Sequence, residues 1–446
     1  MRVRWFSVTG SFLLLAVWQS GINTSFEAGA DRFAMPRLGL ENAVQAESLD
    51  TFSIEPVGSF PGRLSNFIPD DRGVVMYESD ANQTRLFSFD GAEMLSFSDT
   101  IIQFAPNGQV MALMSPRGYG AISNPYTTRL MTLEGKEIAS FSGLEPGFVP
   151  DTELLTILDQ DEQRSRLVNF AGEELAVLEG RYFGAALGPQ DIVTFSRTEN
   201  RYYLYDLNGV EIASFPGGIG GWNAMPDNQS VLVSEAGQTR WFDRNGVELA
   251  TYSGRIAGTL PDGQAIFLHS QAENISRLVS LDGEEIASYA GQFVTLTPNH
   301  QGLVTSPSEV GEAQIYTLDG TEVAVMPDAF RAFGPDGEGM FVSAYNWQNP
   351  DDQKTGLYTM EGDEIATFAG AFNAFWPELE IVITSTSQRL ETREWFMQTH
   401  LYSLDGEVLA TVEGSFGGIS PNQKLLAVSP NVSPQTTELY RIRMGE

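Results

Sequence analysis

Few residues of this chain belong to the types that catalyse reactions or bind metal ions. The chain has 446 residues, with three histidines and no cysteine. Without cysteine it has no thiolate nucleophile, no disulfide, no thiolate metal ligand and no lipid-bearing cysteine. His269, His300 and His400 could serve as general bases or zinc ligands, because imidazole does both near neutral pH. Whether they do so depends on how the fold positions them.

A sequence motif that occurs nine times indicates that fold. In its fullest form it reads Leu-Asp-Gly-Glu-Glu-Ile-Ala-Ser-Tyr, at residues 281–289. Such a recurrence indicates one supersecondary unit copied along the chain. The glycines of the nine copies are Gly91, Gly135, Gly172, Gly209, Gly246, Gly283, Gly320, Gly362 and Gly406.

One unit encodes four short strands, which we name a, b, c and d. Asp282-Gly283 reaches positive φ easily and predicts a two-residue type I′ hairpin between strands c and d. The flanking residues 277–281 and 285–289 alternate with period two, as half-buried strands do. A second turn, Pro261-Asp262-Gly263, precedes the apolar residues 265–268 and predicts the connection between strands a and b. The predicted fold is therefore all-β, and each repeat unit forms a four-stranded antiparallel sheet, which we call a blade.

The number of turn prolines predicts about ten blades. The chain enters on a d strand at residues 57–60 and leaves on a c strand at 439–442, so the N-terminal strand is expected to complete the last blade. We expect one ring closed by this outer strand; two five-bladed rings are the alternative. The ten prolines are Pro69, Pro106, Pro150, Pro189, Pro226, Pro261, Pro298, Pro335, Pro377 and Pro421.

The inner strands carry two columns of residues that predict how blades pack. Three residues before each proline the side chain is small or uncharged, as at Gly147 and Gly258, and we expect this column to face the ring axis. The next residue is mostly large and apolar, as at Phe104 and Phe148, and we expect this second column to pack between blades.

The repeat resembles the WD-repeat family and is similar to the Pro-Asp-Gly repeats of the periplasmic Tol-system propeller. Residues 205–206 and 242–243, Tyr-Asp and Phe-Asp, stand where Trp-Asp occurs in WD repeats. Gly254 matches the glycine of the Gly-His pair, but Arg255 replaces the histidine. The resemblance covers residues 56–446. It implies a β-propeller and brings no catalytic residue with it.

The N-terminal residues predict export. Residues 1–4 are basic, residues 12–18 are apolar, and Ala28-Gly29-Ala30 offers small residues for cleavage. We expect a signal peptide at 1–30, a flexible leader at 31–55 and a β-propeller repeat domain at 56–446. The Ala-x-x-Ala pattern at residues 43–46 offers an alternative cleavage site. We expect the cleaved protein to have no membrane span and to be periplasmic or extracellular.

The charge of the chain restricts its partners. The formal net charge is −32, from 58 acidic and 26 basic residues. Such a surface repels nucleic acid and anionic membranes, so we expect no nucleic-acid partner. It favours solubility, and we expect a monomer that works in a saline exterior.

No pattern predicts a catalytic centre. The repeat places the three histidines in three different blades and at different heights, so we do not expect them to converge. The glycine-rich residues 215–221 connect strand d to strand a and do not form a phosphate-binding loop before a helix. Acidic pairs such as Glu284-Glu285 are expected to be solvated. We therefore expect no catalytic residue, no metal and no cofactor.

The repeat is interrupted by three long loops between strands b and c. In a propeller these loops emerge on one face, together with the connections from d to a, and insertions on one face often form a binding surface. Their aromatic residues are candidates for binding, because exposed aromatic side chains commonly anchor interfaces. Alternatively, the two tryptophans cap their hairpins. The candidates are Tyr119, Tyr126, Trp347, Trp395 and Phe396.

These observations favour an exported, non-catalytic β-propeller that binds a protein or polysaccharide partner through one loop face. One alternative is an envelope hydrolase or lyase of propeller fold with an acidic active site. Convergent carboxylates near the channel mouth would support that alternative. A second alternative is an intracellular WD-repeat-like scaffold, which an uncleaved N-terminus would favour.

Overall fold

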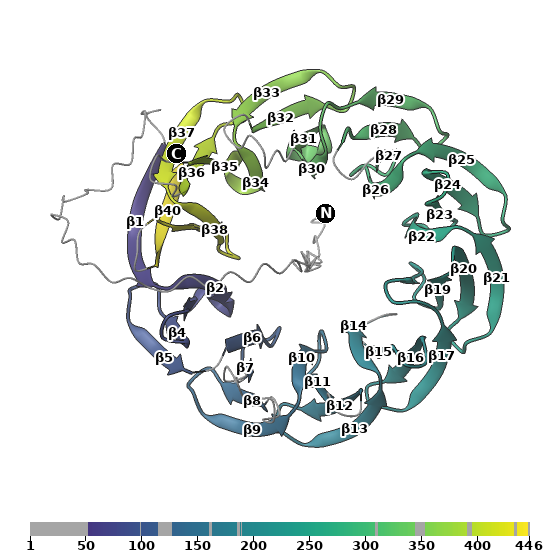
Figure 1. Cartoon of the computed structure of the whole chain (residues 1–446), viewed down its shortest axis with the longest axis horizontal. Helices are drawn as coiled ribbons and strands as arrows, with labels where there is room; N and C mark the ends of the chain where they lie inside the picture. The colour runs from purple at the N-terminus through teal and green to yellow at the C-terminus, as the bar shows by residue number, and fades with distance from the viewer. Residues whose placement is uncertain are drawn as a thin grey trace, which may run out of the picture. The chain divides into compact units, whose positions relative to one another are not determined.

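The computed structural model contains ten four-stranded antiparallel sheets arranged around a central opening (Figure 1). This confirms the predicted ten-bladed β-propeller in a single ring. The structure describes residues 52–98, 100–114, 127–159, 163–184, 188, 190–307, 311–343, 353–389, 395–431 and 435–444. Within these ranges no helix is long and apolar enough to cross a membrane.

Each blade runs from an inner strand a to an outer strand d. Blades 1 to 3 comprise β2 (Arg63–Ile68), β3 (Gly73–Glu78), β4 (Gln83–Phe87) and β5 (Glu93–Phe97); β6 (Thr100–Phe104), β7 (Val110–Met114), β8 (Thr127–Thr132) and β9 (Glu137–Ser142); and β10 (Leu144–Phe148), β11 (Leu154–Asp159), β12 (Arg164–Asn169) and β13 (Glu174–Glu179). Blades 4 to 6 comprise β14 (Arg181–Gly184), β15 (Asp191–Ser196), β16 (Arg201–Asp206) and β17 (Glu211–Pro216); β18 (Trp222–Ala224), β19 (Ser230–Glu235), β20 (Gln238–Asp243) and β21 (Glu248–Ser253); and β22 (Arg255–Thr259), β23 (Ala265–Ser270), β24 (Ile275–Ser280) and β25 (Glu285–Ala290).

The remaining four blades follow the same order, and blade 10 takes its outer strand from the start of the described chain. Blades 7 and 8 comprise β26 (Gln292–Leu296), β27 (Gly302–Ser306), β28 (Gln314–Thr317) and β29 (Glu322–Val325); and β30 (Phe330–Phe333), β31 (Gly339–Ser343), β32 (Lys354–Thr359) and β33 (Glu364–Ala369). Blades 9 and 10 comprise β34 (Ala371–Trp376), β35 (Ile381–Arg389), β36 (Trp395–Tyr402) and β37 (Val408–Glu413); and β38 (Ser415–Ile419), β39 (Leu425–Ser429), β40 (Thr436–Met444) and β1 (Phe52–Pro61). Short 3₁₀ turns lie between strands a and b at η1 (Pro69–Asp71), η2 (Pro335–Gly337) and η4 (Pro377–Leu379).

The ring closes as predicted, with β1 paired antiparallel to β40. The pairing runs from Phe52 opposite Met444 to Pro61 opposite Thr436, with a bulge between Pro56 and Gly58. The strand begins at Phe52, so residues 52–55, which the sequence assigned to the leader, belong to the outer strand. The apolar side chains of Phe52 and Ile54 explain the earlier start, because both pack against the buried cluster between blades 9 and 10.

The turns between strands c and d differ from the type I′ prediction, which was wrong. In blade 6, the Gly283 N–H donates to the Ser280 carbonyl over 3.0 Å, and the Ser280 N–H donates to the Glu284 carbonyl over 2.9 Å. Gly283 has a φ of 87°, whereas Asp282 is not among the residues with positive φ. The connection is therefore a three-residue turn that ends on a left-handed glycine, followed by a bulge.

A polar residue three positions before each turn glycine accounts for this geometry. The Glu284 N–H donates to the Ser280 hydroxyl over 3.1 Å, and equivalent side-chain oxygens accept backbone N–H groups in most other turns. In the turns that begin at Ser88 and Thr317 the hydroxyl donates to a carbonyl, and Asp90 or Asp319 accepts the N–H. Such local bonds stabilise a turn that is one residue wider than the predicted one. The nine residues at this position are Ser88, Thr132, Asn169, Asp206, Asp243, Ser280, Thr317, Thr359 and Ser403.

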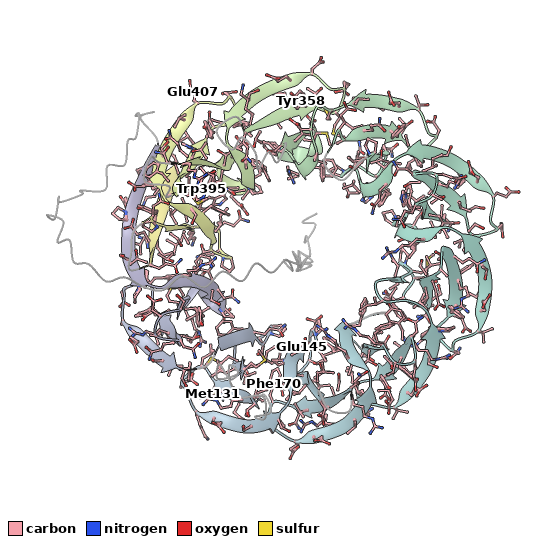
Figure 2. The ribbon with its side chains drawn as sticks, viewed as in Figure 1. Met131, Glu145, Phe170, Tyr358, Trp395 and Glu407 are labelled. Atoms are coloured by element: carbon pink, nitrogen blue, oxygen red, sulfur yellow. The ribbon has the colours of Figure 1, made fainter. Side chains whose placement is uncertain are left out.

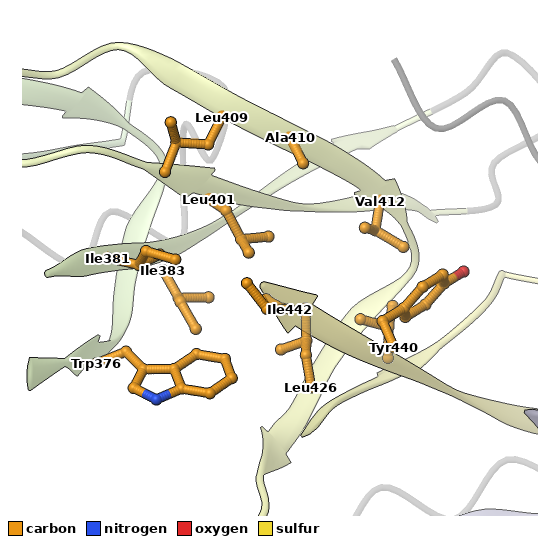
Figure 3. Close-up of a cluster of buried hydrophobic side chains, with 11 residues drawn as sticks. Trp376, Ile381, Ile383, Leu401, Leu409, Ala410, Val412, Leu426, Tyr440 and Ile442 are labelled. Carbon is orange, nitrogen blue, oxygen red and sulfur yellow. The ribbon is translucent and has the colours of Figure 1, made fainter. Parts of the chain in front are cut away.

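The hydrophobic core consists of layers between neighbouring blades. Figure 3 shows one of them, in which Trp376, Ile383 and Leu401 of blade 9 face Leu426 and Tyr440 of blade 10. All five side chains are almost completely buried. Each blade thus contributes its two faces to two different layers, which makes the stability of any blade depend on both neighbours.

The small column of the inner strands packs between blades and does not face the axis, so that expectation was wrong. A Cβ atom on Gly258 of blade 6 would lie 2.9 Å from the Phe293 ring of blade 7. On Gly147 of blade 3 it would lie 2.4 Å from the Tyr182 ring of blade 4. At these two positions only glycine fits, because an aromatic ring of the next blade occupies the space. The large column packs between blades as expected, with Phe104 and Phe148 buried in such layers.

A buried hydroxyl on strand c fastens most blades to the next one. In blade 6 the Ser276 hydroxyl donates to the Gly291 carbonyl over 2.8 Å and accepts the Phe293 N–H over 2.8 Å. Gly291 and Phe293 lie where the chain enters blade 7. We call this group the latch hydroxyl. The same donation to the entry glycine is made by Thr128, Ser165, Thr239, Thr355, Thr399 and Thr437.

The latch also joins the two ends of the ring. Thr437 of β40 donates to the Gly62 carbonyl over 3.0 Å and accepts the Leu64 N–H over 3.1 Å. Blade 7 departs from the pattern, with Ala313 at the latch position. In blade 1 the Thr84 hydroxyl has no hydrogen-bond partner among the described residues.

Candidate binding face

The hairpin of strands b and c in blade 9 is longer than its counterpart in blade 6. In blade 6, one residue pair, Ser270 opposite Ile275, lies beyond the pair that holds the latch hydroxyl. In blade 9, four pairs lie beyond Ser385 opposite Thr399, and the last is Arg389 opposite Trp395. Three additional pairs at the rise of a β-strand extend the hairpin by ~10 Å.

The two predicted aromatic residues of this hairpin lie on opposite flanks. Alternate residues of a strand point to opposite faces. Ile383 packs toward blade 10 and Val382 packs toward blade 8. Trp395 therefore shares the blade 10 flank with Arg389, and Phe396 lies on the blade 8 flank, so the two rings form no joint surface.

Trp395 is the more accessible of the two residues. Its relative exposure is 51%, whereas Phe396 is half-buried. Figure 2 labels Trp395 on blade 9. Because an indole ring offers a large apolar surface and one N–H donor, this exposed position can contribute much contact area at small conformational cost.

Blade 10 braces the base of the hairpin extension. The Met397 N–H donates to Asn431 Oδ1 over 3.2 Å, and Asn431 Nδ2 donates to the Met397 carbonyl over 2.8 Å. The carboxamide thus pairs with Met397 as a neighbouring strand would. The Met397 carbonyl also accepts the Gly414 N–H over 2.8 Å. These bonds fix the backbone two residues from Trp395. This role of Asn431 was not predictable from the sequence, because the residue lies in the next blade.

The other predicted binding residues, Tyr119, Tyr126 and Trp347, lie outside the described residues. So do the predicted signal peptide at 1–30 and most of the leader. Their assignment stays a prediction from the sequence.

The histidines lie in three blades, as the repeat predicted. His269 is in β23, with Nδ1 3.2 Å from the Ser276 hydroxyl, and His300 occupies the a-to-b turn of blade 7 with a φ of 55°. His400 lies within β36, between the hydroxyls of Thr386 and Thr411, at 2.8 and 2.9 Å. Burial lowers the pKa of His400 below its ordinary value, which keeps the imidazole neutral.

Two carboxylates form ion pairs with arginine residues of the neighbouring blade. Asp191 of blade 4 is buried and accepts two bonds from the Arg244 guanidinium of blade 5, at 2.7 and 2.5 Å. Glu145 of blade 3 lies 2.6 Å from Arg181 of blade 4. Within the described ranges, no group of three His, Asp or Glu side chains is positioned to hold a metal ion.

No protein-family model matches this chain, and no curated protein matches it. Among solved structures, a eukaryotic initiation factor is 13% identical over 86% of this chain and 97% of its own, with a TM-score of 0.48. The dihydro-heme d1 dehydrogenase NirN is 11% identical over 82% of this chain and 78% of its own, with a TM-score of 0.42. Hsv2 of Kluyveromyces lactis is 9% identical over 69% of this chain and 100% of its own, with a TM-score of 0.35. Structural similarities this weak do not support a conclusion about function.

Proposed function

We propose that this protein is an exported, non-catalytic β-propeller that binds a protein or polysaccharide partner through the face carrying its b-to-c loops. The observation that carries the proposal is the blade 9 hairpin. It extends beyond the latch by three more residue pairs than blade 6 and presents Trp395, half of whose surface is exposed. Protein interfaces are enriched in tryptophan and arginine, and Arg389 lies directly across the hairpin from Trp395.

Three further properties support the proposal. The hairpin stands on a braced base, so the backbone near Trp395 is positioned before binding and less entropy is lost on association. The signal-like order of residues 1–30 supports export. The net charge of −32 disfavours nucleic acid as the partner. In this proposal the protein acts as a monomer and without a cofactor.

The test is capture of a partner by immobilised protein from the envelope proteins and the polysaccharide fraction of its own source. One variant replaces residues 386–398 with the six residues 270–275 of blade 6, which gives blade 9 a short hairpin. A second variant is Trp395→Ala. The matched control is Leu249→Ala, because Leu249 is 50% exposed but lies on the outer strand β21.

We expect both hairpin variants to lose capture, and Leu249→Ala to retain it, with melting temperatures close to that of the parent protein. Capture that survives both changes would contradict the proposal. Collapse of thermal stability in Trp395→Ala would show that the ring caps its hairpin.

A further inference from the structure

The outer strands carry a glutamate at the same repeat position in most blades. It is the second residue after the turn glycine, as in Glu285, Glu322 and Glu364, and these side chains are exposed. The residue that follows is aliphatic and faces solvent in several blades. Glutamate and aliphatic side chains therefore lie side by side on the rim of the ring.

In part of the ring, an arginine side chain offsets the negative charge of this glutamate. Arg85, Arg129 and Arg277, each at the residue after the latch position on strand c, lie 3.8, 3.8 and 3.3 Å from Glu93, Glu137 and Glu285. These pairs reduce the local negative charge of blades 1, 2 and 6.

Blades 7 and 8 lack the arginine at that position. Gln314 and Gly356 occupy it. Blade 7, residues 292–325, has no lysine or arginine, and blade 8 has Arg331 on the inner strand β30 and Lys354 at the start of β32. The glutamates instead lie beside tyrosine hydroxyls. The Tyr316 hydroxyl lies 3.0 Å from Gln314 Oε1 and 3.4 Å from Glu322, and Tyr358, labelled in Figure 2, donates to Glu364 over 3.2 Å. The negative charge of both carboxylates is therefore retained.

The same two strands expose their largest aliphatic side chains. Val323 and Val325 of β29 are 41% and 44% exposed, and Ile365 of β33 is 52% exposed. The two blades are in contact at their outer parts, because a Cβ atom on Gly362 would lie 3.2 Å from the Ala324 Cβ atom. This contact places the c-to-d turn of blade 8 against β29. The two aliphatic strips thus lie on adjoining blades.

We propose that the outer strands of blades 7 and 8 form a docking strip for a basic, amphipathic segment of a protein partner. Exposed valine and isoleucine side chains take up apolar residues of the segment, and Glu322 and Glu364 pair with its lysine or arginine residues. Charge complementarity selects this occupant, because the strip and the whole chain are both acidic. The strip lies on the rim and is independent of the loop face proposed above.

Burial, and then the neighbouring carboxylate, raise the pKa of both Tyr316 and Tyr358, so both phenols stay protonated at neutral pH. The Tyr358 hydroxyl can then donate to Glu364, and the Tyr316 hydroxyl can lie beside Glu322, without either neutralising the carboxylate.

The test measures binding of a fluorescein-labelled 12-residue peptide of alternating leucine and lysine to the full chain, by fluorescence anisotropy at about 0.15 M sodium chloride. A peptide of alternating serine and lysine has the same charge without the apolar residues. The apolar variant combines Val325→Ser with Ile365→Ser, and the charge variant combines Glu322→Gln with Glu364→Gln.

The matched controls are the equivalent changes in blades 1 and 6, where Arg85 and Arg277 pair with the glutamates. They are Met94→Ser with Ile286→Ser, which are 40% and 52% exposed in the parent protein, and Glu93→Gln with Glu285→Gln. Thermal unfolding of each variant confirms that it is folded.

We expect the two variants in blades 7 and 8 to weaken leucine–lysine binding by about fivefold or more, and the controls by less than about twofold. Equal affinity for the serine–lysine peptide would overturn the proposal, because binding would then depend on charge alone. Equal weakening by the controls, or no binding of the leucine–lysine peptide, would also overturn it.

Discussion

The junctions between blades and the extended hairpin of blade 9 are built from the same repeat but are constrained very differently. At a junction, a latch hydroxyl, an entry glycine and a layer of buried side chains come from two blades and are repeated around the ring. The blade 9 extension departs from the repeat, and one asparagine of blade 10 braces its base. Positions that repeat therefore maintain the ring, and positions that depart from the repeat are free to acquire a function.

The closure junction shows how closely the two ends of the chain reproduce an internal junction. Thr437 and Gly62 make the bond that Ser276 and Gly291 make between blades 6 and 7. The difference is that β1 has no local connection to the other strands of blade 10. Four predictions test the junctions or the hairpin base, and a fifth tests the charged surface.

Removal of residues 52–61 should have the largest effect. The deletion removes β1, exposes one edge of β40 and opens the ring at the one non-local pairing among the described strands. We expect a loss of stability far above the ~1 kcal/mol of a typical point mutation. Thermal unfolding followed by circular dichroism measures it, and an unchanged melting temperature would show that blade 10 is stable with three strands.

Gly258→Ala should destabilise the junction between blades 6 and 7. The added methyl group would lie 2.9 Å from the Phe293 ring, and φ at Gly258 is not positive, so the expected cost is steric. Overpacking of this kind costs about 1–3 kcal/mol. Urea unfolding of Gly258→Ala, and of the same variant combined with Phe293→Leu, checks the cause. The double variant should recover part of the loss if the ring is responsible.

Thr437→Val should weaken the closure by removing the latch hydroxyl. The Gly62 carbonyl and the Leu64 N–H lose their partner, and a buried unsatisfied group costs about 1–3 kcal/mol. Thr399→Val should cost a similar amount at an internal junction. Thr84→Val is the control, because its hydroxyl has no partner among the described residues, and it should change stability little. Equal losses in all three would mean that packing, and not the hydrogen bonds, sets the cost.

His400 should make the hairpin base sensitive to acid. Burial lowers its pKa in the folded state, so the unfolded chain binds the proton more readily and folding is opposed as the pH falls below the ordinary value of about 6.5. His400→Gln should therefore show a smaller loss of stability between about pH 7.5 and pH 5 than the parent protein. Unfolding curves across this range test it, and parallel pH profiles would contradict it.

Salt should produce the smallest effect. The net charge of −32 repels itself on a folded ring, and dissolved ions shorten the reach of this repulsion from about 10 Å at 0.1 M to about 3 Å at 1 M. The melting temperature should rise modestly between low salt and about 0.5 M sodium chloride, and potassium chloride should act alike. A flat or falling curve would indicate that the surface charges are compensated in pairs.

Much of the fold was predictable because the repeat carries it. The proline turns and the split outer strand predicted ten blades and their closure, since both are local signals repeated along the chain. The turn type was not predictable from Asp-Gly alone, because residues such as Ser280, three positions earlier, stabilise the wider turn. The latch was not predictable from the sequence, because its hydroxyl and the glycine that it contacts lie on different blades.

The candidate site was predictable in part. The interruption of the repeat identified Trp395 and Phe396. It did not show that they belong to a strand, in which consecutive residues point to opposite faces. The register with Arg389 and Gln388 places them on different flanks. The bracing by Asn431 depends on contact between neighbouring blades, which spacing along one repeat does not contain.

The closure bond also sets the order in which the ring can be completed. Thr437 and Gly62 are 375 residues apart, so the first described strand is synthesised long before its partner exists. At 5–20 residues per second a ribosome needs roughly 20–75 s to cover that distance. During this interval the nascent chain can assemble blades one after another, but β1 has no strand to pair with. Pairing of β1 with β40 can begin only after β40 has been synthesised, so closure of the ring by β1 cannot precede synthesis of the last described strand.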